Sequence, residues 1–255
     1  MIKTFLRAPW AQKACAYALG LFILLGLWPE AYAGSFSVSP VRIYMKPRDR
    51  AVAVTLVNEG NSPVALQADI NVWTQRPDGT DELVLTEDLI LSPPIIKLAP
   101  QARQVVRLAL LKPFDASRQL TYRLVVREIP EATQPQSSGL QVPIALALSM
   151  PVFITPPVAK REMKCELGIA MPNVSAAEPK VLCANTGSAY AQIREAVLKQ
   201  GDTALARFEG GSYILPGAKK ALTLSSESKQ PFSGSLTLDV TYDDSQSERF
   251  TFTAP

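Results

Sequence analysis

Few residues of this chain could do covalent chemistry. Its 255 residues include no histidine, so the usual general base is missing, and with it Ser-His-Asp and Cys-His catalysis. A zinc site is implausible, because the three cysteines have no histidine to complete a ligand set. The sequence also lacks a glycine-rich phosphate loop and the H-E-x-x-H and G-x-S-x-G motifs. We therefore expect no enzyme, no cofactor and no bound metal.

The first 33 residues have the layout of an export signal. Basic residues come first, residues 14–28 form a fifteen-residue apolar stretch, and Ala31-Tyr32-Ala33 is an A-x-A cleavage site. A retained membrane anchor is the alternative, but the apolar stretch is shorter than the ~20 residues that span a bilayer, and Pro29 ends it. We predict a signal peptide at 1–33, a mature chain that starts near Gly34, and no stable insertion of that chain in a membrane.

The charge balance favours no strongly charged partner. The whole chain has a formal net charge of +3, which falls to about +1 once the charged residues of the signal are removed. A nucleic-acid-binding domain usually has a marked excess of Lys and Arg. We therefore expect no nucleic acid among the partners.

The cysteines of the mature chain are even in number. Cleavage of the signal would remove Cys15 and leave Cys165 and Cys183. In an exported chain, such a pair favours a disulfide. It would close a loop of roughly 18 residues and contribute about 3 kcal/mol on the chain-entropy model. We predict a disulfide between Cys165 and Cys183.

Short strand patterns separated by turns run through the rest of the chain. In the first half they lie at 36–44, 51–58, 64–73, 82–85, 89–91, 97–98, 104–111 and 120–129. In the second half they lie at 164–170, 180–185, 189–198, 204–209 and 219–224, followed by a hairpin at 235–253. Residues 191–200 also fit a short helix, but their flanks favour a strand. Pro77-Asp78-Gly79 is a turn signal. The spacing is typical of an all-β, antiparallel Greek-key fold.

The stretch from Gln141 to Thr155, QVPIALALSMPVFIT, organises the first half. Every second residue is bulky and apolar, and we call this row the ridge: Val142, Ile144, Leu146 and Leu148. The ridge would be roughly 20 Å long at ~3.3 Å per residue. Pro143 has no N–H group, which argues for the edge of a sheet. An ordinary core strand is the simplest interpretation. The alternative is a strand offered to a partner chain, with ridge side chains outside the protein's own core.

Thr155-Pro156-Pro157 divides the chain. Two prolines cannot donate to a sheet ladder, so we expect a short and stiff link here. The segments on either side, 34–155 and 158–255, each have the size of one immunoglobulin-like β-sandwich. We predict two such domains in sequence.

Five motifs of the first half are similar to those of one family. They are SPVRIY (39–44), LSPPIIKLAP (91–100), QVVRL (104–108), YRLVVREIP (122–130) and LSMPVFITP (148–156). In this order they resemble the periplasmic pilus chaperones of the PapD family, and LSPP, YRLVVREIP and LSMPVF resemble its archaic, Csu-like branch. The resemblance covers residues 36–157. The second domain is assigned by its size, strand content and position.

This resemblance implies two immunoglobulin-like domains that meet at an angle and a function without catalysis. The last strand of the first domain would complete the sandwich of a pilus subunit that lacks its own seventh strand, by donor-strand complementation. In this chain, the ridge would fill the cleft of that subunit. The implied partners are pilus (fimbrial) subunits and an outer-membrane usher, and the implied location is the periplasm.

The family also binds the C-terminal carboxylate of the subunit with two basic residues. Arg42 matches the first of them, on the first strand. The second is missing, because the donor strand itself contains no Lys or Arg. On the neighbouring strand, Arg123 and Arg127 alternate with apolar residues and point away from the core. We expect Arg123 to supply the second charge. The alternative is that Arg42 and Arg123 are ordinary surface arginines.

The resemblance places two more residues near the usher-facing surface, Pro93 and Ile129. A fixed bend at Ser92-Pro93-Pro94, which could contain a cis bond, and a plain strand end at Ile129 explain them equally well. Three aromatic residues are expected in the core: Trp73, Tyr122 and Phe153.

Two other classes of function stay open. The chain could itself be a structural pilin or adhesin of a surface fibre, which would predict an extended N-terminal arm, yet strand signals begin two residues after Gly34. An enzyme is the other class, and no combination of acid, base and nucleophile supports it. The motifs favour a chaperone.

Overall fold

The computed structural model describes residues 36–113, 115–130, 145–168, 178–227 and 234–254. The predicted signal peptide and the ridge residues Val142 and Ile144 lie outside these ranges. The described residues form eighteen strands and no helix, as the all-β prediction requires. Among them no helix exists that is long and apolar enough to cross a membrane.

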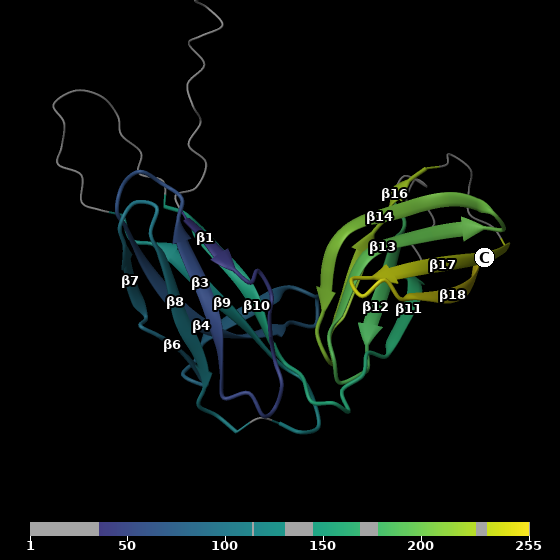
Figure 1. Cartoon of the computed structure of the whole chain (residues 1–255). Coiled ribbons are helices and arrows are strands. Elements are labelled where there is room, and N and C mark those ends of the chain that lie inside the picture. Colours follow the sequence, from purple (N-terminus) through teal and green to yellow (C-terminus); the bar gives the residue numbers. More distant parts are fainter. Residues whose placement is uncertain (1–35, 114, 131–144, 169–177, 228–233, 255) are drawn as a thin grey trace, which may run out of the picture. The chain divides into compact units, whose positions relative to one another are not determined.

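The first ten strands form one sandwich, drawn from purple to teal in Figure 1. Its first sheet has the order β1-β3-β8-β6, and its second has the order β2-β10-β9-β4-β5, with β7 also paired to β4. The strands are β1 (Phe36–Ser39), β2 (Ile43–Met45), β3 (Ala51–Asn58), β4 (Val64–Gln75), β5 (Asp81–Leu85), β6 (Leu89–Ser92), β7 (Ile95–Leu98), β8 (Arg103–Leu110), β9 (Leu120–Glu128) and β10 (Ala147–Ile154).

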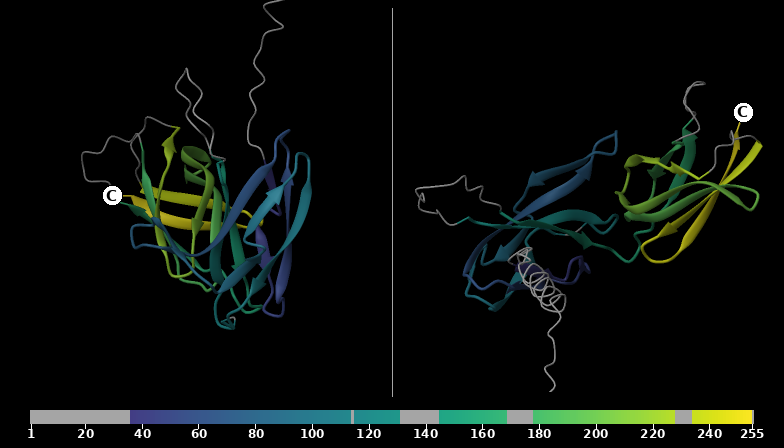
Figure 2. Two further views of the ribbon diagram at one scale, coloured as in Figure 1. Left: turned by 90° about the vertical axis from the view of Figure 1, so that its left-hand side faces the viewer. Right: turned by 90° about the horizontal axis from the view of Figure 1, so that it is seen from above.

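The last eight strands form a second sandwich, drawn in green and yellow. One sheet has the order β11-β12-β15 and the other the order β16-β14-β13-β17-β18. The strands are β11 (Met163–Gly168), β12 (Lys180–Asn185), β13 (Ala191–Gln200), β14 (Thr203–Ile214), β15 (Lys219–Thr223), β16 (Ser225–Ser226), β17 (Gly234–Tyr242) and β18 (Ser247–Ala254). The yellow hairpin of β17 and β18 lies beside the green strands of its sheet in Figure 2. Residues 191–200 are thus a strand, as their flanks indicated.

Alternating apolar residues fill the space between the sheets. In β9, Tyr122, Leu124 and Val126 are buried in the first core, because every second side chain of a strand faces inward. The three expected core aromatics are all buried to 2% exposure or less. Trp73 and Phe153, however, pack with the second core, because they lie on the outer face of the sheet that contains β4 and β10.

Three local predictions are confirmed. The Pro77-Asp78-Gly79 turn closes with a hydrogen bond from the Gly79 N–H to the Arg76 carbonyl at 2.9 Å, and Gly79 adopts a positive φ of 83°. The Ser92–Pro93 peptide bond is cis. Cys165 and Cys183 lie opposite each other on β11 and β12 and form the disulfide.

Candidate functional site

Strand β10 has a partner on both edges along only part of its length. It pairs with β9 from Ala147 to Ile154, whereas the parallel strand β2 covers the other edge only from Val152 to Ile154. No other strand of the described residues pairs with that edge. The segment from Ala147 to Pro151 therefore offers an open edge to a further strand.

The hydrogen bonds to β9 decide which groups face this open edge. The Glu128 N–H donates to the Leu146 carbonyl at 2.9 Å, so the even-numbered residues of this segment bond to β9. The N–H groups of Ala147 and Ser149 consequently face the open edge. Pro151 is the next residue on that side, where its missing N–H removes no bond to β9.

The even-numbered side chains of β10 point between the two sheets. Met150 is buried, and the ridge residues Leu146 and Leu148 are half-buried and pack against the first core. The expectation that ridge side chains lie outside the protein's own core is therefore wrong for these two leucines. They cover the core on the side where β10 has no neighbour, and they keep part of their surface exposed.

Arg42 lies directly before β2 and is held by a carboxylate. Its Nη1 donates to Asp243 Oδ2 at 2.9 Å, and 35% of its side chain is exposed. Burial lowers the pKa of Arg42, but the hydrogen bond with Tyr44, followed by the electrostatic effects of Tyr213, Tyr44 and Asp243, outweighs this effect, so the pKa lies above its ordinary value. Arg42 is thus a charged, accessible anion-binding group, although one nitrogen already has a partner.

Arg123 differs in its surroundings. Its Cζ lies 3.8 Å from the centroid of the Trp73 ring, on the face of β9 opposite the first core. Within the described residues it has no ion-pair or hydrogen-bond partner. Burial lowers its pKa, while Asp81 partly opposes that shift. A half-buried guanidinium that is stacked on an aromatic ring, and to which no carboxylate of the described residues is bonded, is available to bind one.

Tyr213 of β14 connects the two arginines. Its ring centroid lies 5.9 Å from the Arg42 Cζ and 5.6 Å from the Arg123 Cζ. The structure therefore brings Arg42 and Arg123 to one aromatic ring. Arg127 is different, because it forms an ion pair with Asp69 at 2.7 Å.

Sequence reasoning missed Asp243, Tyr190 and Tyr213 as neighbours of this site. The side chain of Gln75 fixes the Tyr213 segment, since its amide donates to the Tyr213 carbonyl and accepts from the Leu215 N–H, each at 2.9 Å. Asp243, Tyr190 and Tyr213 all come from the second half of the chain, about which the motifs say nothing. No sequence signal could have found them.

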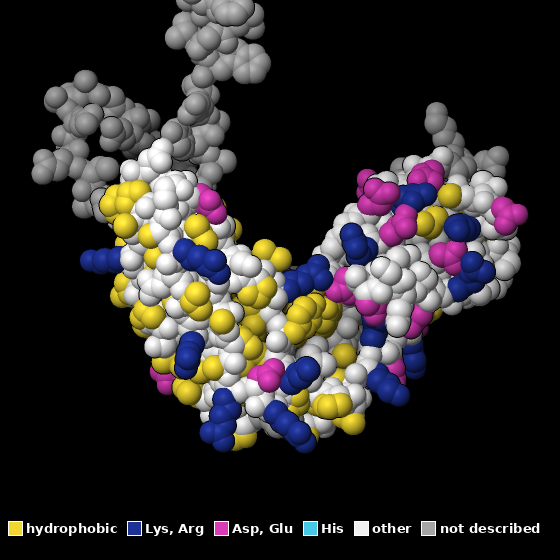
Figure 3. Space-filling view, in the orientation of Figure 1, with side chains coloured by type: hydrophobic (Ala, Val, Ile, Leu, Met, Phe, Trp, Pro, Cys, Tyr) yellow, Lys and Arg dark blue, Asp and Glu magenta, His cyan; other side chains and the backbone are white. Residues whose placement is uncertain are grey.

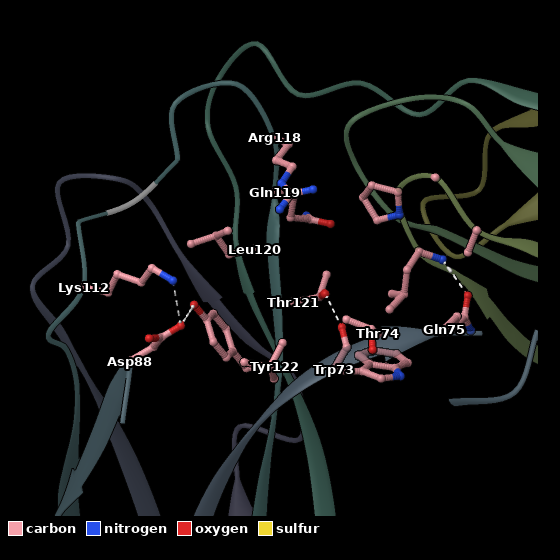
Figure 4. Close-up of a pocket in the computed structure, with 15 residues that line it drawn as sticks. Trp73, Thr74, Gln75, Asp88, Lys112, Arg118, Gln119, Leu120, Thr121 and Tyr122 are labelled. Atoms are coloured by element: carbon pink, nitrogen blue, oxygen red, sulfur yellow. Dashed lines mark hydrogen bonds and ion pairs between the residues drawn. The ribbon is translucent and has the colours of Figure 1, made fainter. Parts of the chain in front are cut away.

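Two pockets lie near these residues. One has a volume of about 800 Å³ and is lined by Arg42, Tyr190 and Asp243 among others. The other has a volume of about 330 Å³ and is drawn in Figure 4. There, Lys112 and Tyr122 both point to Asp88, with distances of 3.4 and 3.1 Å to its Oδ2. The pocket beside Arg42 is the larger of the two and contains a predicted carboxylate-binding residue, so it is the better candidate for a ligand.

The first sandwich exposes most of the large hydrophobic side chains. Of twelve in the described residues, ten precede Val158, and yellow side chains are accordingly frequent over β1–β10 in Figure 3. They include Ile129, which is 36% exposed. Pro93 is exposed as well. Both expected usher-facing residues flank β4, because the Pro94 carbonyl accepts from the Ala68 N–H and the Ile129 N–H donates to the Ala65 carbonyl.

Solved structures of chaperones have the same fold. The CsuC–CsuE chaperone–tip adhesion subunit pre-assembly complex of Acinetobacter baumannii contains a chain with 17% identity and a TM-score of 0.62, over 86% of this chain and 98% of that chain. The Pseudomonas aeruginosa CupB2 chaperone has 17% identity and a TM-score of 0.54, and the match covers 86% of this chain and 100% of that chain. The complex of the Salmonella enterica SafA pilin with the SafB chaperone contains a chain with 14% identity and a TM-score of 0.56, and the match covers 88% of this chain and 98% of that chain. A comparison with curated proteins gives no match.

The sequence itself matches a family over the first sandwich. Residues 35–160 match the pili and flagellar-assembly chaperones, PapD N-terminal domain. This range contains the open edge of β10 and both candidate arginines, and the structural similarity extends over the second sandwich as well. Residues 35–160 therefore belong to the PapD-like family of pilus chaperones, and the chain as a whole has the fold of these chaperones.

Proposed function

We propose that this protein is a periplasmic chaperone that holds pilus subunits by donor-strand complementation and delivers them to an outer-membrane usher. The open edge at Ala147–Pro151 carries this proposal, because an exposed strand edge with apolar side chains beside it favours pairing with another chain. The family membership supports the chaperone role, and structures of relatives with a tip adhesion subunit and with a pilin support the class of partner.

In this proposal, Arg42 and Arg123 bind the C-terminal carboxylate of the subunit. Arg42 can present a planar fork of N–H donors to a carboxylate. Arg123 adds a second positive charge beside the shared Tyr213 ring. The ridge would enter the subunit's cleft, with Val142 and Ile144 extending the row begun by Leu146 and Leu148.

The remaining assignments belong to the same proposal. The segment 34–155 binds the subunit, the segment 158–255 is the second domain, and Pro93 and Ile129 face the usher. The motifs place the protein in the archaic, Csu-like branch. Export depends on cleavage of the signal at 1–33, so mass spectrometry of the exported protein should find an N-terminus near Gly34. A chain that still begins at Met1 would contradict this part.

Two variants of β10 test the central claim by co-purification with pilus subunits. Leu148→Glu places a charge in the ridge, where it must lose its hydration without a partner. Ser149→Pro removes an open-edge N–H but leaves the bonds to β9 in place. Leu148→Glu should reduce the co-purified subunit by at least about tenfold, since one buried leucine contributes ~1.5–3 kcal/mol. Ser149→Pro should reduce it as well, because the incoming strand loses a backbone hydrogen-bond donor.

A matched control lies in the second sandwich. Leu182→Glu changes a leucine of strand β12 that is 40% exposed, and it should leave subunit capture unchanged. Thermal melts of all three variants separate lost binding from lost folding. Leu148 is half-buried, so Leu148→Glu could unfold the protein. In that case Ser149→Pro alone tests whether the subunit binds at the open edge. Normal capture by a folded Ser149→Pro variant would contradict binding at the open edge.

A further inference from the structure

The guanidinium of Arg42 is occupied by a group of the same chemistry as its proposed ligand. Asp243, which follows β17 at the turn to β18, accepts a hydrogen bond from Arg42 Nη1 through its Oδ2 at 2.9 Å. The two residues are 201 positions apart in the chain. The Asp243 side chain is only 10% exposed, so its carboxylate is held in place and shielded from solvent.

A second donor helps to hold this carboxylate. The Tyr190 hydroxyl donates to the same Asp243 Oδ2 at 2.9 Å, and it lies 3.0 Å from the Tyr44 hydroxyl. Burial and the contact with Tyr44 raise the pKa of Tyr190, so its hydroxyl stays protonated and keeps donating. The pair with Arg42 joins one nitrogen to one oxygen, whereas a free carboxylate could engage the fork with both oxygens.

The pocket beside Arg42 has room for a chain terminus but no surplus of positive charge. Its volume is about 800 Å³. Its basic lining residues are Arg42, Lys46, Lys160 and Arg161, and its acidic ones are Asp49, Asp243, Asp244 and Glu248. These four acids balance the four bases. An incoming carboxylate therefore gains little attraction while Asp243 is charged and bound to Arg42.

We propose that Asp243 is an internal substitute for the subunit's terminal carboxylate, which occupies Arg42 in the free chaperone and gives it up when a subunit binds. The proposal rests on the proposed function, because it assigns a competitor to the same site. Asp243 stabilises the empty protein and weakens subunit binding by the same contact. A residue that merely orients Arg42 would instead support binding.

The variant Asp243→Asn tests this, because it keeps the shape of the side chain and removes its charge. The probe is a peptide with the C-terminal sequence of a subunit that co-purifies with the wild-type chain. Affinity for the peptide should rise about threefold to tenfold, while the melting temperature of the free protein should fall. The gain should disappear with the same peptide amidated at its C-terminus, and in the double variant Arg42→Ala/Asp243→Asn.

Asp244→Asn is the matched control, since this neighbouring carboxylate binds Arg161 at 3.1 Å instead of Arg42. It should not raise the affinity. Unchanged or weaker binding by Asp243→Asn, with normal binding by the wild-type chain, would overturn the proposal and leave the proposed function intact. If no subunit co-purifies with the wild-type chain, the proposed function fails, and this proposal fails with it.

Discussion

The two sandwiches differ in their exposed apolar side chains and in the pairing of some of their charges. In the first, a strand edge at Ala147–Pro151 has no described partner, Arg123 has no carboxylate bonded to it among the described residues, and most of the large exposed hydrophobic residues are found there. In the second, charged side chains are joined in groups. Asp239 binds both Lys199 and Arg249, and Arg207 binds Glu195 and Glu227.

We interpret this difference as a distinction between the proposed binding surface and the sandwich that supports it. Unpaired edges and exposed apolar side chains are liabilities in a free protein, which natural proteins usually cover. Where one sandwich keeps ten of the twelve large exposed hydrophobic residues and its neighbour in the same chain keeps few, they mark the place where a partner is expected. The changes below should therefore affect binding in the first sandwich and stability in the second.

Loss of the disulfide should have the largest effect. The double variant Cys165→Ser/Cys183→Ser should lower the free energy of unfolding by about 3 kcal/mol, because the reduced chain regains the entropy of an open loop. Denaturant unfolding measures this loss. Subunit affinity should stay unchanged at temperatures where the variant is folded. A marked loss of affinity in the folded variant would break the division between the two sandwiches.

Removal of Arg42 should come next. A charge-assisted bond to the subunit carboxylate contributes on the order of 1.5–3 kcal/mol, so Arg42→Ala should weaken binding by about 10- to 150-fold. Arg127→Ala is the matched control on the same sheet, because Arg127 is already paired with Asp69. Affinity measurements that find equal losses for the two variants would argue against a carboxylate site at Arg42.

Arg123→Ala should weaken binding less, by about fivefold, because stacking on Trp73 already disperses part of its charge. In a chain without the first 33 residues, Trp73 is the sole tryptophan, so its fluorescence should report directly on events at Arg123. Subunit binding should change the emission of the wild-type protein but not of Arg123→Ala.

A double variant tests whether both arginines share one carboxylate. If they do, Arg42→Ala/Arg123→Ala should lose less binding free energy than the sum of the losses of the two single variants. Losses of binding free energy that add fully would mean that the two arginines do not bind the same carboxylate.

The charge group around Asp239 should have the smallest effect. Hydrogen bonds from Arg249 and Lys199 lower the pKa of Asp239 to about 2, from an ordinary 3.8. Since the folded pKa is the lower one, the stabilisation is present above about pH 4 and is lost as the pH falls toward 2. Asp239→Asn should thus destabilise by about 0.5 kcal/mol or less at pH 7, because Arg249 is 68% exposed and its pair is screened. Thermal melts should show a smaller difference at pH 2 than at pH 7, because Asp239 is partly protonated at pH 2. An equal difference at both pH values would contradict this account.

Much of the fold could be predicted from the sequence, because the patterns that indicate strands and turns involve only neighbouring residues. The alternation in β9 and the hairpin of β17 and β18 need only neighbouring residues, and both strands of that hairpin appear where the sequence predicted them. The disulfide was predictable for a similar reason, since only two cysteines follow residue 33. Even the ambiguous segment at β13 was decided correctly by its flanks.

The site was less predictable because it depends on distant contacts. The alternation of β9 placed Arg123 on the outer face, but nothing in the sequence indicated that Trp73 would lie beneath it. Arg42 was found through a family motif, while its partner Asp243 lies in a half of the chain without motifs. The prediction for the ridge was wrong for a different reason. Periodicity shows which residues share a face of a strand, but not whether they also pack against the protein's own core.

The short strand β2 also determines the direction in which a partner must enter. It runs parallel to β10 and begins with Ile43 opposite Val152, so it occupies the line that a strand on the open edge would follow. A strand added there in the same orientation as β10 would end where β2 begins, and its C-terminus would arrive beside Arg42. A strand of the opposite orientation would bring an amino group to that guanidinium and be repelled. The position at which β2 begins and the charge of Arg42 therefore together favour one polarity of the incoming chain.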